Sequence, residues 1–522
     1  MSGSALDFRN RAALFDTLDG KTFDVIIIGG GVTGAGIARD AAMRGLSVAL
    51  IEARDFASGT SSRSSKMIHG GLRYMAQGDL GLVAEAASER KAIERVAPHL
   101  TRLTPFVIPS KNAAVTAKLR AGMWAFEKLG GVPKDRRHAV WSRADLMARE
   151  PSLATDDLSG AVVYPEYLTD DARLTLANVR SAAAHGARVL SYAPVVSILT
   201  EGGKASGVVV DDGLTGDKAR ARVHGRLIIN AAGPWVDAIR SLEDPGADVR
   251  LKLSKGIHLV VPRARLPVAR TIIMPAADRR SVFAVPKGEM TYLGTTDTFY
   301  PDADYWPKIT GQDVDYLLAA SALRFTIDPL TRADIVSAWS GVRPLVAQEG
   351  KSASEISRKD EIWTGPSGVL SIAGGKLTAY RMMAERVVDM AQTALGQKVT
   401  AAQSATEPLV GGDVDVAALT LAQGERLVGL YGAEAKLIAD AGGGPAAEAT
   451  HAVLNEGALT LEDYWVRRSA RAWFDPDGGV AALAPAAQAM GALLGWSAAQ
   501  TQSQIETCMA LRVDNLAALE TV

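Results

Sequence analysis

One segment constrains the fold of this chain more than any other: residues 24–36 read Asp-Val-Ile-Ile-Ile-Gly-Gly-Gly-Val-Thr-Gly-Ala-Gly. The apolar run Val25–Ile28 is typical of a buried parallel strand. Gly29, Gly31 and Gly34 then follow the pattern G-x-G-x-x-G. In that pattern the glycines permit a tight turn, the approach of a pyrophosphate to the backbone, and packing of the next helix on the strand. The segment therefore predicts a dinucleotide-binding turn.

A second predicted strand strengthens this interpretation. It covers Ser47–Ile51 and ends at Glu52. An acid at that place can accept hydrogen bonds from a ribose. Strand, glycine turn, helix and acid together favour dinucleotide binding over the alternative, which is a glycine-rich turn in an unrelated α/β protein.

The composition excludes several other classes of protein. The chain has 522 residues, 48% of them hydrophobic and 22% charged, as expected of a soluble globular protein with a large core. A net charge of -1 does not favour binding to nucleic acid. Cys508 is the one cysteine, which rules out internal disulfides and cysteine-rich metal sites and suits a reducing compartment. Any redox chemistry therefore needs a cofactor.

Two segments bear on targeting and membranes. Residues 1–20 are polar and lack the apolar stretch of a signal peptide, so we expect a disordered or loosely docked extension. The segment Val480–Gln500 is uncharged and rich in alanine, and it contains Pro485 and Gln488. We predict a packed helix there rather than a transmembrane span.

The rest of the chain shows a recognisable order of elements. A long helical pattern covers Leu80–Val96, and short strand-like runs with turns between them fill residues 251–345. Residues 372–378 show the same order of strand, glycine turn and helix as residues 24–36. Such a turn offers free N–H groups to an anion. After about residue 400 the chain is rich in alanine and leucine, which predicts a helical C-terminal domain.

The candidate functional side chains outside the glycines are mostly cationic. Arginine suits a phosphate or carboxylate because its planar fork can donate two parallel hydrogen bonds. A histidine is the usual general base near neutral pH, although a structural role remains the alternative for any single one. Taken singly, such a cation is more often a solvated surface charge, but flanking proline or glycine favours a functional role for Arg343 and Lys376 more than for the others. The candidates are Arg73, Arg280, Arg343, Arg358, Lys376, His69 and His258.

Several motifs taken in order resemble one family, the FAD-dependent (aerobic, respiratory) glycerol-3-phosphate dehydrogenases. The resemblance covers about residues 21–480, and its most specific motif is Ser-Ser-Lys-Met-Ile-His-Gly-Gly-Leu-Arg-Tyr at residues 64–74. Residues 461–468 resemble the C-terminal helical domain of that family. The remaining motifs are residues 25–36, 169–174, 230–235, 294–297, 341–344 and 374–381.

The resemblance implies an α/β fold of the glycine/D-amino-acid oxidase type. It has a Rossmann-like FAD-binding domain, a β-rich substrate domain and a helical C-terminal domain. The expected division is an N-terminal extension at 1–20, a discontinuous FAD-binding domain at 21–95, 165–250 and 346–400, a substrate-binding domain at 96–164 and 251–345, and a helical domain at 405–522.

The same resemblance assigns the cofactor residues. FAD should lie extended, with its pyrophosphate on the first glycine turn, its ribose on Glu52 and its pyrimidine edge on the later glycine turn. A small residue, Gly233, would lie close under the dinucleotide. The implied cofactor residues are Gly29, Gly31, Thr33, Gly34, Glu52, Thr60, Ser61, Ser62, Ser65, Gly233, Gly374, Lys376, Leu377 and Thr378.

The resemblance also implies a reaction, in which a base removes the C2 hydroxyl proton of glycerol 3-phosphate as hydride leaves C2 for FAD N5. His258 would be the base, Arg343 and Arg358 would hold the phosphate, and Lys376 would lie near the flavin. Arg73, Tyr74, Arg280 and Thr296 would complete the substrate pocket.

The implied partners are a quinone that takes up the electrons and a second copy of the chain in a homodimer. The enzyme would be cytoplasmic, with peripheral contact to the inner face of the cell membrane. Residues 118–129 mix apolar, aromatic and basic side chains as an interfacial helix would, although an ordinary amphipathic helix has the same pattern.

Four alternatives stay open at this point. The motifs are also compatible with a dehydrogenase of another polyol phosphate, such as erythritol phosphate, or with an oxygen-reducing oxidase. The oxidases usually carry an inserted segment that is not seen here. A flavin-binding protein without turnover would not need the arginines, histidine and lysine of the motifs. A nicotinamide-dependent dehydrogenase would not need the serine-rich segment and the later glycine turn.

Overall fold

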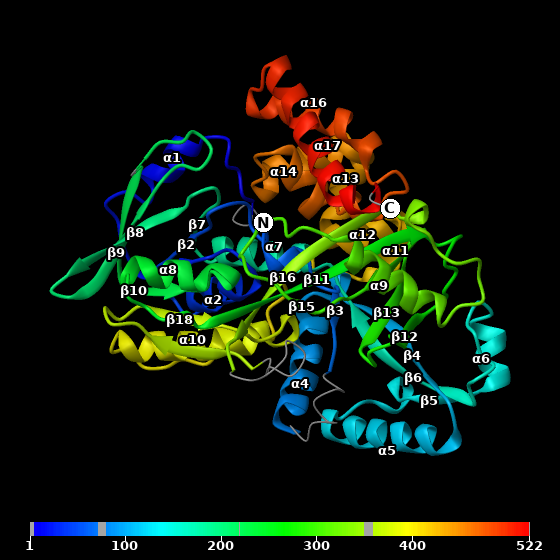
Figure 1. Cartoon of the computed structure of the whole chain (residues 1–522). Helices are drawn as coiled ribbons and strands as arrows, with labels where there is room; N and C mark the ends of the chain where they lie inside the picture. The colour runs from blue at the N-terminus through cyan, green and yellow to red at the C-terminus, as the bar shows by residue number, and fades with distance from the viewer. Residues whose placement is uncertain (1–4, 71–79, 219, 349–358, 521–522) are drawn as a thin grey trace.

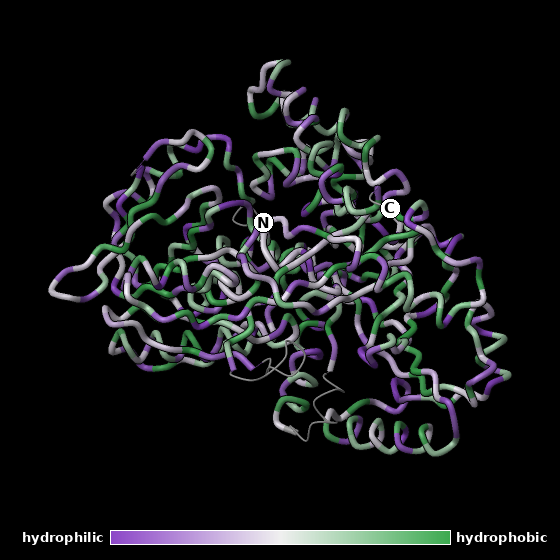
Figure 2. Tube along the Cα trace, viewed as in Figure 1, coloured by the Kyte–Doolittle hydropathy of each residue, from purple (hydrophilic) through white to green (hydrophobic). Residues whose placement is uncertain are grey.

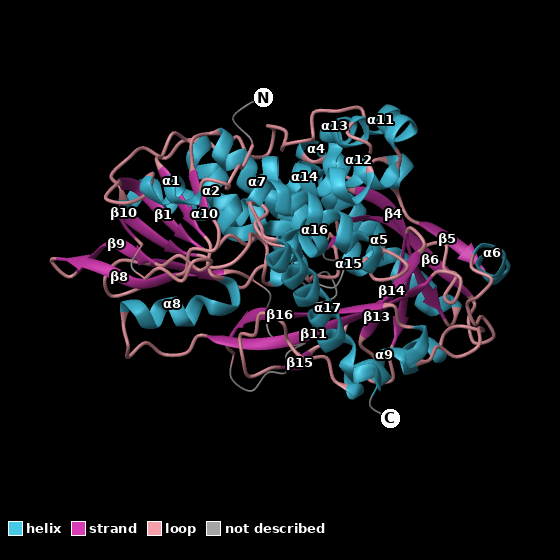
Figure 3. Ribbon diagram, turned by 90° about the horizontal axis from the view of Figure 1, so that it is seen from above, coloured by secondary structure: helices cyan, strands magenta, loops and turns pink. Residues whose placement is uncertain are grey.

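The computed structural model describes residues 5–70, 80–218, 220–348 and 359–520. They form two β-sheets that lie side by side, with a group of C-terminal helices above the place where the sheets meet (Figures 1 and 3). The predicted α/β class with a β-rich part and a helical C-terminal part is confirmed.

The first sheet has the parallel centre that the glycine-rich unit predicts. Its main path runs β17-β18-β10-β1-β2-β7, and β1 pairs in parallel with both β10 and β2. The β8–β9 hairpin extends it through an antiparallel pairing of β9 with β10. The strands are β1 (Thr22–Ile28), β2 (Val48–Ile51), β7 (Arg188–Leu190), β8 (Val195–Glu201), β9 (Lys204–Val210), β10 (Ala221–Asn230), β17 (Glu361–Thr364) and β18 (Leu370–Ala373).

Both faces of this sheet are covered, which explains why β1 is apolar at successive positions rather than at alternate ones. Val25 and Ile27 pack toward helices α2 (Val32–Met43), α7 (Asp171–Ala184) and α10 (Tyr380–Ala394). Ile26 and Ile28 belong to a separate core on the opposite face. On that side the sheet also meets α8 (Val236–Glu243).

The second sheet is mostly antiparallel and contains the longer strands. Its main path is β15-β11-β14-β13-β12-β4-β6-β3, and β11 pairs along its length with β16. The strands are β3 (Met67–Ile68), β4 (Arg102–Ser110), β5 (Ala139–Ser142), β6 (Gly160–Leu168), β11 (Leu251–Pro262), β12 (Thr271–Pro275), β13 (Ser281–Lys287), β14 (Met290–Gly294), β15 (Thr298–Phe299) and β16 (Ser337–Val346).

Helices surround this sheet and connect it to the first. Helix α5 follows β4 and lies at the lower edge of the molecule in Figure 1, where Figure 2 shows its mixed hydrophobic and hydrophilic turns. The helices are α4 (Leu80–Val96), α5 (Ala113–Gly130), α6 (Arg143–Arg149) and α9 (Gly311–Ala322). The bounds of α4 are those that the sequence pattern predicts.

The C-terminal part is helical, as predicted, and packs on a face of the second sheet. Trp339 and Tyr292 of the sheet share a core with Trp473 and Leu483 of these helices. The helices are α11 (Val416–Gln423), α12 (Glu425–Tyr431), α13 (Ala435–Asp440), α14 (Gly444–Glu456), a π-helical segment (Asp463–Arg468), α15 (Arg471–Phe474), α16 (Val480–Leu494) and α17 (Ala498–Glu520).

The uncharged C-terminal segment becomes α16, with Pro485 inside the helix and its inner side chains buried. Among the residues that the structure describes, no helix is both long and apolar enough to cross a membrane.

The expectation of a disordered or loosely docked N-terminal extension is wrong for residues 5–20. Helix α1 (Arg11–Asp16) places Phe15 against the first sheet, with no exposed surface. Arg11 pairs with Asp212 at 2.8 Å. The segment is polar overall, but most of its larger apolar side chains are buried and hold it in place: Leu6, Phe8, Phe15 and Leu18.

Candidate active site

A cavity of about 950 Å³ opens between the two sheets. Its walls come from the first glycine turn, the turn after β18, the serine-rich segment before β3, and the strands β11, β13 and β16. Cavities that hold small ligands and cofactors measure about 300–1,000 Å³, so this one suits a large ligand. The cavity brings the two predicted glycine turns to one place.

The first glycine turn has no room for side chains at its key positions. A Cβ on Gly34 would lie 1.9 Å from the carbonyl oxygen of Gly29. A Cβ on Gly29 would lie 2.6 Å from the carbonyl oxygen of Ala231, and Gly29 has a φ of 110°. Gly29, Gly31 and Thr33 line the cavity, whereas Gly34 lies behind it, where α2 crosses β1. The turn thus exposes backbone at the N-terminus of α2, where an anion is favoured.

Glu52 lies at the end of β2, beside this turn. Its carboxylate accepts hydrogen bonds from the backbone N–H of Gly30 at 2.6 Å and of Arg54 at 2.9 Å. Burial raises the pKa of Glu52, although these backbone donors oppose the effect. The side chain lines the cavity, so its oxygens can also accept a hydrogen bond from a ligand.

The serine-rich segment links the cavity to both sheets. Ser61 Oγ accepts a hydrogen bond from the N–H of Val32 at 2.9 Å, at the start of α2. Thr60 Oγ1 donates to the carbonyl of Val342 on β16 at 2.6 Å. Thr60, Ser61 and Ser65 line the cavity. Ser62 is buried beside it, and its hydroxyl has no hydrogen-bond partner among the described residues.

The later glycine turn forms another part of the cavity wall. Gly374 and Gly375 have φ angles of 80° and 76°, and a Cβ on Gly375 would meet Met383 Sδ at 2.4 Å. Gly233, Gly374, Lys376 and Leu377 all line the cavity. Thr378 is buried behind them, and its hydroxyl bonds with the backbone of His69.

Two of the predicted arginines line the cavity together. Arg343 on β16 pairs with Asp297 at 3.2 Å and donates to Thr295 Oγ1 at 3.1 Å. Arg280 donates to the carbonyl oxygen of Asp297 at 2.8 Å and pairs with Asp278 at 2.5 Å. The two guanidinium groups therefore share Asp297 as a neighbour. Gly256 on the adjoining strand makes room for Arg343, because a Cβ there would lie 2.3 Å from its Nη2.

His258 is buried on β11 and does not itself line the cavity. Its Nε2 lies 2.9 Å from Ser65 Oγ, and its ring stacks on Trp339 at 4.6 Å between centroids. Gly294 leaves the space for the imidazole, since a Cβ there would lie 2.0 Å from Cδ2. Burial, followed by Arg343 and Lys66, holds the pKa of His258 well below 6.5. The ring is therefore neutral near pH 7.

The remaining predicted residues are placed as follows. Thr296 is buried, and its hydroxyl accepts from the N–H of Ile257 at 3.0 Å, while its neighbour Thr295 lines the cavity. His69 lines the cavity as well. Arg73, Tyr74 and Arg358 lie outside the described residues.

Sequence reasoning missed one wall of the cavity. Apolar side chains form this wall, and they belong to Met67, Phe106, Ile108, Leu119, Ile273 and Phe283. Phe106 and Ile108 alternate along β4 as residues of one strand face should, but Pro105 and Pro109 disguise the strand.

Two family models match the chain. The model described as FAD dependent oxidoreductase matches residues 24–381, and the model described as C-terminal domain of alpha-glycerophosphate oxidase matches residues 402–501.

Individual relatives agree with these models. The chain is 39% identical to the aerobic glycerol-3-phosphate dehydrogenase of Bacillus subtilis, covering 87% of this chain and 88% of the relative. It is 42% identical to the enzyme of the same name from Staphylococcus haemolyticus, covering 78% and 75% of the two chains. The solved glycerol-3-phosphate dehydrogenase of Bacillus halodurans, complexed with FAD, aligns with a TM-score of 0.82 at 30% identity and covers 99% of both chains. The chain therefore belongs to the FAD-dependent glycerol-3-phosphate dehydrogenase family.

Proposed function

We propose that this chain oxidises sn-glycerol 3-phosphate to dihydroxyacetone phosphate with FAD as its cofactor. The observation that carries the proposal is one continuous cavity. It joins a dinucleotide-type glycine turn to Arg280 and Arg343, which can hold a phosphate, and it passes the Ser65–His258 pair, which can accept a proton.

The residues of the cavity fit FAD. In our proposal the pyrophosphate lies on Gly29–Gly34 at the N-terminus of α2, and the adenosine ribose bonds to Glu52. A Cβ on Gly29 or Gly34 would collide with backbone atoms, so this tight turn requires glycine at both positions, as a turn that presents its backbone to a pyrophosphate does. The flavin side would be lined by Thr60, Ser61, Ser62, Ser65, Gly233, Gly374, Lys376, Leu377 and Thr378.

When bound, FAD supplies the hydride acceptor, and the chain supplies the position of the substrate. Arg343 and Arg280 attract the dianionic phosphate and anchor one end of a three-carbon molecule. Binding energy from that remote group can orient C2 toward the flavin. Asp297, which also lines the cavity, holds both guanidinium groups: its carboxylate pairs with Arg343 and its backbone carbonyl accepts from Arg280. In the proposal Thr296, Arg73, Tyr74 and Arg358 complete the pocket.

The chain also accepts the proton of the C2 hydroxyl. His258 is too deeply buried to line the cavity, whereas Ser65 lines it and lies 2.9 Å from His258 Nε2. We propose that the proton moves to His258 through the Ser65 hydroxyl. Lys376, at the later glycine turn, adds a positive charge beside the reacting centre, where negative charge develops.

A substrate series tests the function. With a dye as electron acceptor, kcat/KM should be highest for glycerol 3-phosphate and should drop strongly for glycerol, which lacks the phosphate. Erythritol phosphate is the informative competitor, because the same arginines would hold its phosphate. A higher kcat/KM for erythritol phosphate would change the assigned substrate and leave the reaction type intact.

We further propose a quinone as electron acceptor and peripheral contact with the cell membrane. Helix α5 supports this, since it buries Met123 and Phe126 and leaves Trp124 57% exposed and Leu129 45% exposed beside Lys128. Leu119 of the same helix belongs to the apolar wall of the cavity. Apolar and basic side chains on one surface helix suit a lipid interface.

Vesicle flotation tests the membrane proposal. The protein should float with anionic phospholipid vesicles, and Trp124→Glu should abolish flotation, whereas Val249→Glu, which changes an even more exposed apolar residue elsewhere, should not. Equal flotation of both variants would refute a role for α5. A homodimer, which we also propose, should sediment with twice the mass of one chain, and a monomer would contradict it.

A further inference from the structure

The loop from Glu52 to Ala57 is attached to the first glycine turn. Gly30 donates its N–H to Glu52 Oε2 at 2.6 Å and accepts a hydrogen bond from the N–H of Ala57 at 3.0 Å. A Cβ on Gly30 would lie 2.6 Å from the ring of Phe56. Loop and turn therefore form one unit, and a shift of the loop moves Glu52 relative to the turn.

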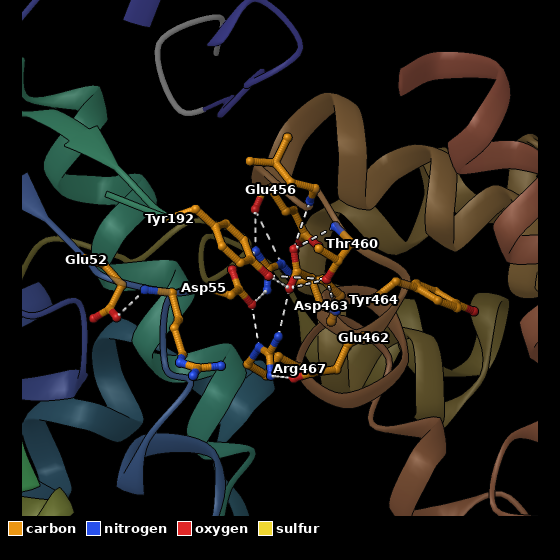
Figure 4. A network of polar contacts seen from close by, with 12 residues as sticks. Glu52, Asp55, Tyr192, Glu456, Thr460, Glu462, Asp463, Tyr464 and Arg467 are labelled. Atoms are coloured by element: carbon orange, nitrogen blue, oxygen red, sulfur yellow. Dashed lines mark hydrogen bonds and ion pairs between the residues drawn. The ribbon is translucent and has the colours of Figure 1, made fainter. Parts of the chain in front are cut away.

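Asp55, in the middle of this loop, binds two arginines of the C-terminal helical part. The side chain is fully buried. Arg467 Nε donates to Asp55 Oδ2, and Arg468 donates to both carboxylate oxygens at 2.5 and 2.8 Å. Figure 4 shows Asp55 and Glu52 on one side and Arg467 on the other, reaching across from the π-helical segment.

The arginines are themselves fixed in direction. Arg467 also donates to Glu462 and Asp463, both at 2.7 Å. Arg468 donates to the carbonyl of Glu456 at 2.9 Å. Burial alone would raise the pKa of Asp55, but Arg468 and Arg467 together lower it, so the residue is a carboxylate. Removing this one charge would leave two buried guanidinium groups without their shared partner, which is costly.

A second contact ties the same loop to the same helical segment. Tyr192 donates its N–H to the carbonyl of Arg54 at 2.8 Å, and its hydroxyl donates to Asp463 at 2.6 Å. Ala193 donates its N–H to the carbonyl of Glu52 at 2.8 Å. Residues 52–55 are thus held both directly and through the segment after β7.

We infer that Asp55 is a positioning residue for FAD, through which Arg467 and Arg468 of the C-terminal domain hold Glu52 at the adenosine ribose. The inference rests on the proposed role of Glu52. It gives the C-terminal domain a function in cofactor retention, and it explains why two consecutive arginines end the helical motif at residues 461–468. The C-terminal domain thus holds the loop Glu52–Ala57 in place from outside the cavity.

The test compares FAD release from the holoenzymes of two variants. Asp55→Asn keeps the shape of the side chain and removes its charge. Glu434→Gln is the matched control, because Glu434 also joins the C-terminal helices to α7, through Arg180 at 2.6 Å, but pairs with Arg180 and His451 rather than with the loop Glu52–Ala57. We expect Asp55→Asn to release FAD about tenfold faster or more, the equivalent of about 1.4 kcal/mol. Glu434→Gln should lower the melting temperature and leave FAD release unchanged.

Equal FAD release in both variants would overturn the inference, since Asp55 would then contribute only to stability. If Asp55→Asn does not fold, Arg468→Lys serves instead. Lysine keeps the positive charge but loses the paired hydrogen bonds that Arg468 donates to the two carboxylate oxygens of Asp55. This variant should therefore also release FAD faster.

A double variant separates this inference from the assignment of Glu52. If Asp55 acts through Glu52, Asp55→Asn should have little further effect on FAD release in a Glu52→Gln background. Fully additive effects would contradict positioning through Glu52. Normal FAD binding in Glu52→Gln alone would instead show that the proposed ribose contact is wrong.

Discussion

The imidazole Nε2 of His258 lies 2.9 Å from the hydroxyl oxygen of Ser65, and of the two residues only Ser65 lines the cavity. A buried, neutral histidine thus reaches the cavity through one hydroxyl. The arrangement keeps the imidazole away from solvent, and the ring of Trp339 stacks on it.

Replacing His258 by Asn should lower kcat by about a hundredfold or more, because a positioned general base contributes about 10²–10⁴-fold. FAD should stay bound. His224→Gln, on β10 of the first sheet, is the control and should turn over normally. Stopped-flow reduction of the bound flavin measures the step directly, and a parental rate in His258→Asn would remove this residue as the base.

The pH dependence of the same step follows from the low pKa of His258. Because the basic form of this residue persists well below pH 6.5, it should cause no loss of flavin-reduction rate between pH 8 and 6.5. The contrary result would be a parent protein whose flavin-reduction rate falls with a pKa near 7, together with a His258→Asn variant in which this fall is absent. It would show that the imidazole is not desolvated as described.

Arg343→Ala should lower kcat/KM for glycerol 3-phosphate by about tenfold to a hundredfold, since a hydrogen bond to a charged group contributes about 1.5–3 kcal/mol. KM should rise and kcat should fall, because the phosphate both anchors and orients the substrate. Arg265→Ala, which removes an arginine paired with Asp334 at the surface, is the matched control. Unchanged turnover by Arg343→Ala would exclude Arg343 from the site.

Gly34→Ala should yield a protein that cannot retain FAD. The new methyl group would lie 1.9 Å from the carbonyl of Gly29, so the glycine turn must distort. The control is Gly429→Ala in α12, where a Cβ meets nothing within 4 Å. Visible absorption of the purified proteins reports the flavin content, and a fully yellow Gly34→Ala protein would contradict this account of the turn.

His451 gives a stability test in the C-terminal domain. Although burial lowers the pKa of His451, the carboxylates of Glu434 and Glu456, which lie 3.4 and 3.6 Å from its Nε2, raise this pKa from 6.5 to about 9. The charged form is thus favoured in the folded state, and its contribution to stability is full below pH 6.5 and lost as the pH rises through about 9. The difference in melting temperature between the parent and His451→Gln should shrink across that range. A constant difference would contradict a protonated His451.

Local sequence patterns predict the first sheet well. The apolar run of β1, the glycine turn and the strand ending at Glu52 all follow from short-range rules, because a buried parallel strand and a phosphate turn each restrict the residues that can occupy them. The strand predicted at Ser47–Ile51 is observed at Val48–Ile51.

Short-range rules could not predict contacts between residues that lie far apart in the sequence. Nothing local shows that Arg467 reaches Asp55, 412 residues away in the chain. The prolines of β4 obscured its strand pattern. In residues 5–20 the apolar side chains that pack against the first sheet, such as Phe15 and Leu18, are too few among polar residues to predict that packing. The resemblance to a family supplied the site residues, and their roles, like the domain limits, remain predictions.

The most direct test of the central claim is an anaerobic titration of the purified holoenzyme with glycerol 3-phosphate, followed through the visible absorption of the flavin. The account predicts that the flavin bands bleach as substrate is added, that dihydroxyacetone phosphate forms in equal amount, and that Arg343→Ala needs far more substrate. Flavin bands that persist at saturating glycerol 3-phosphate would contradict it.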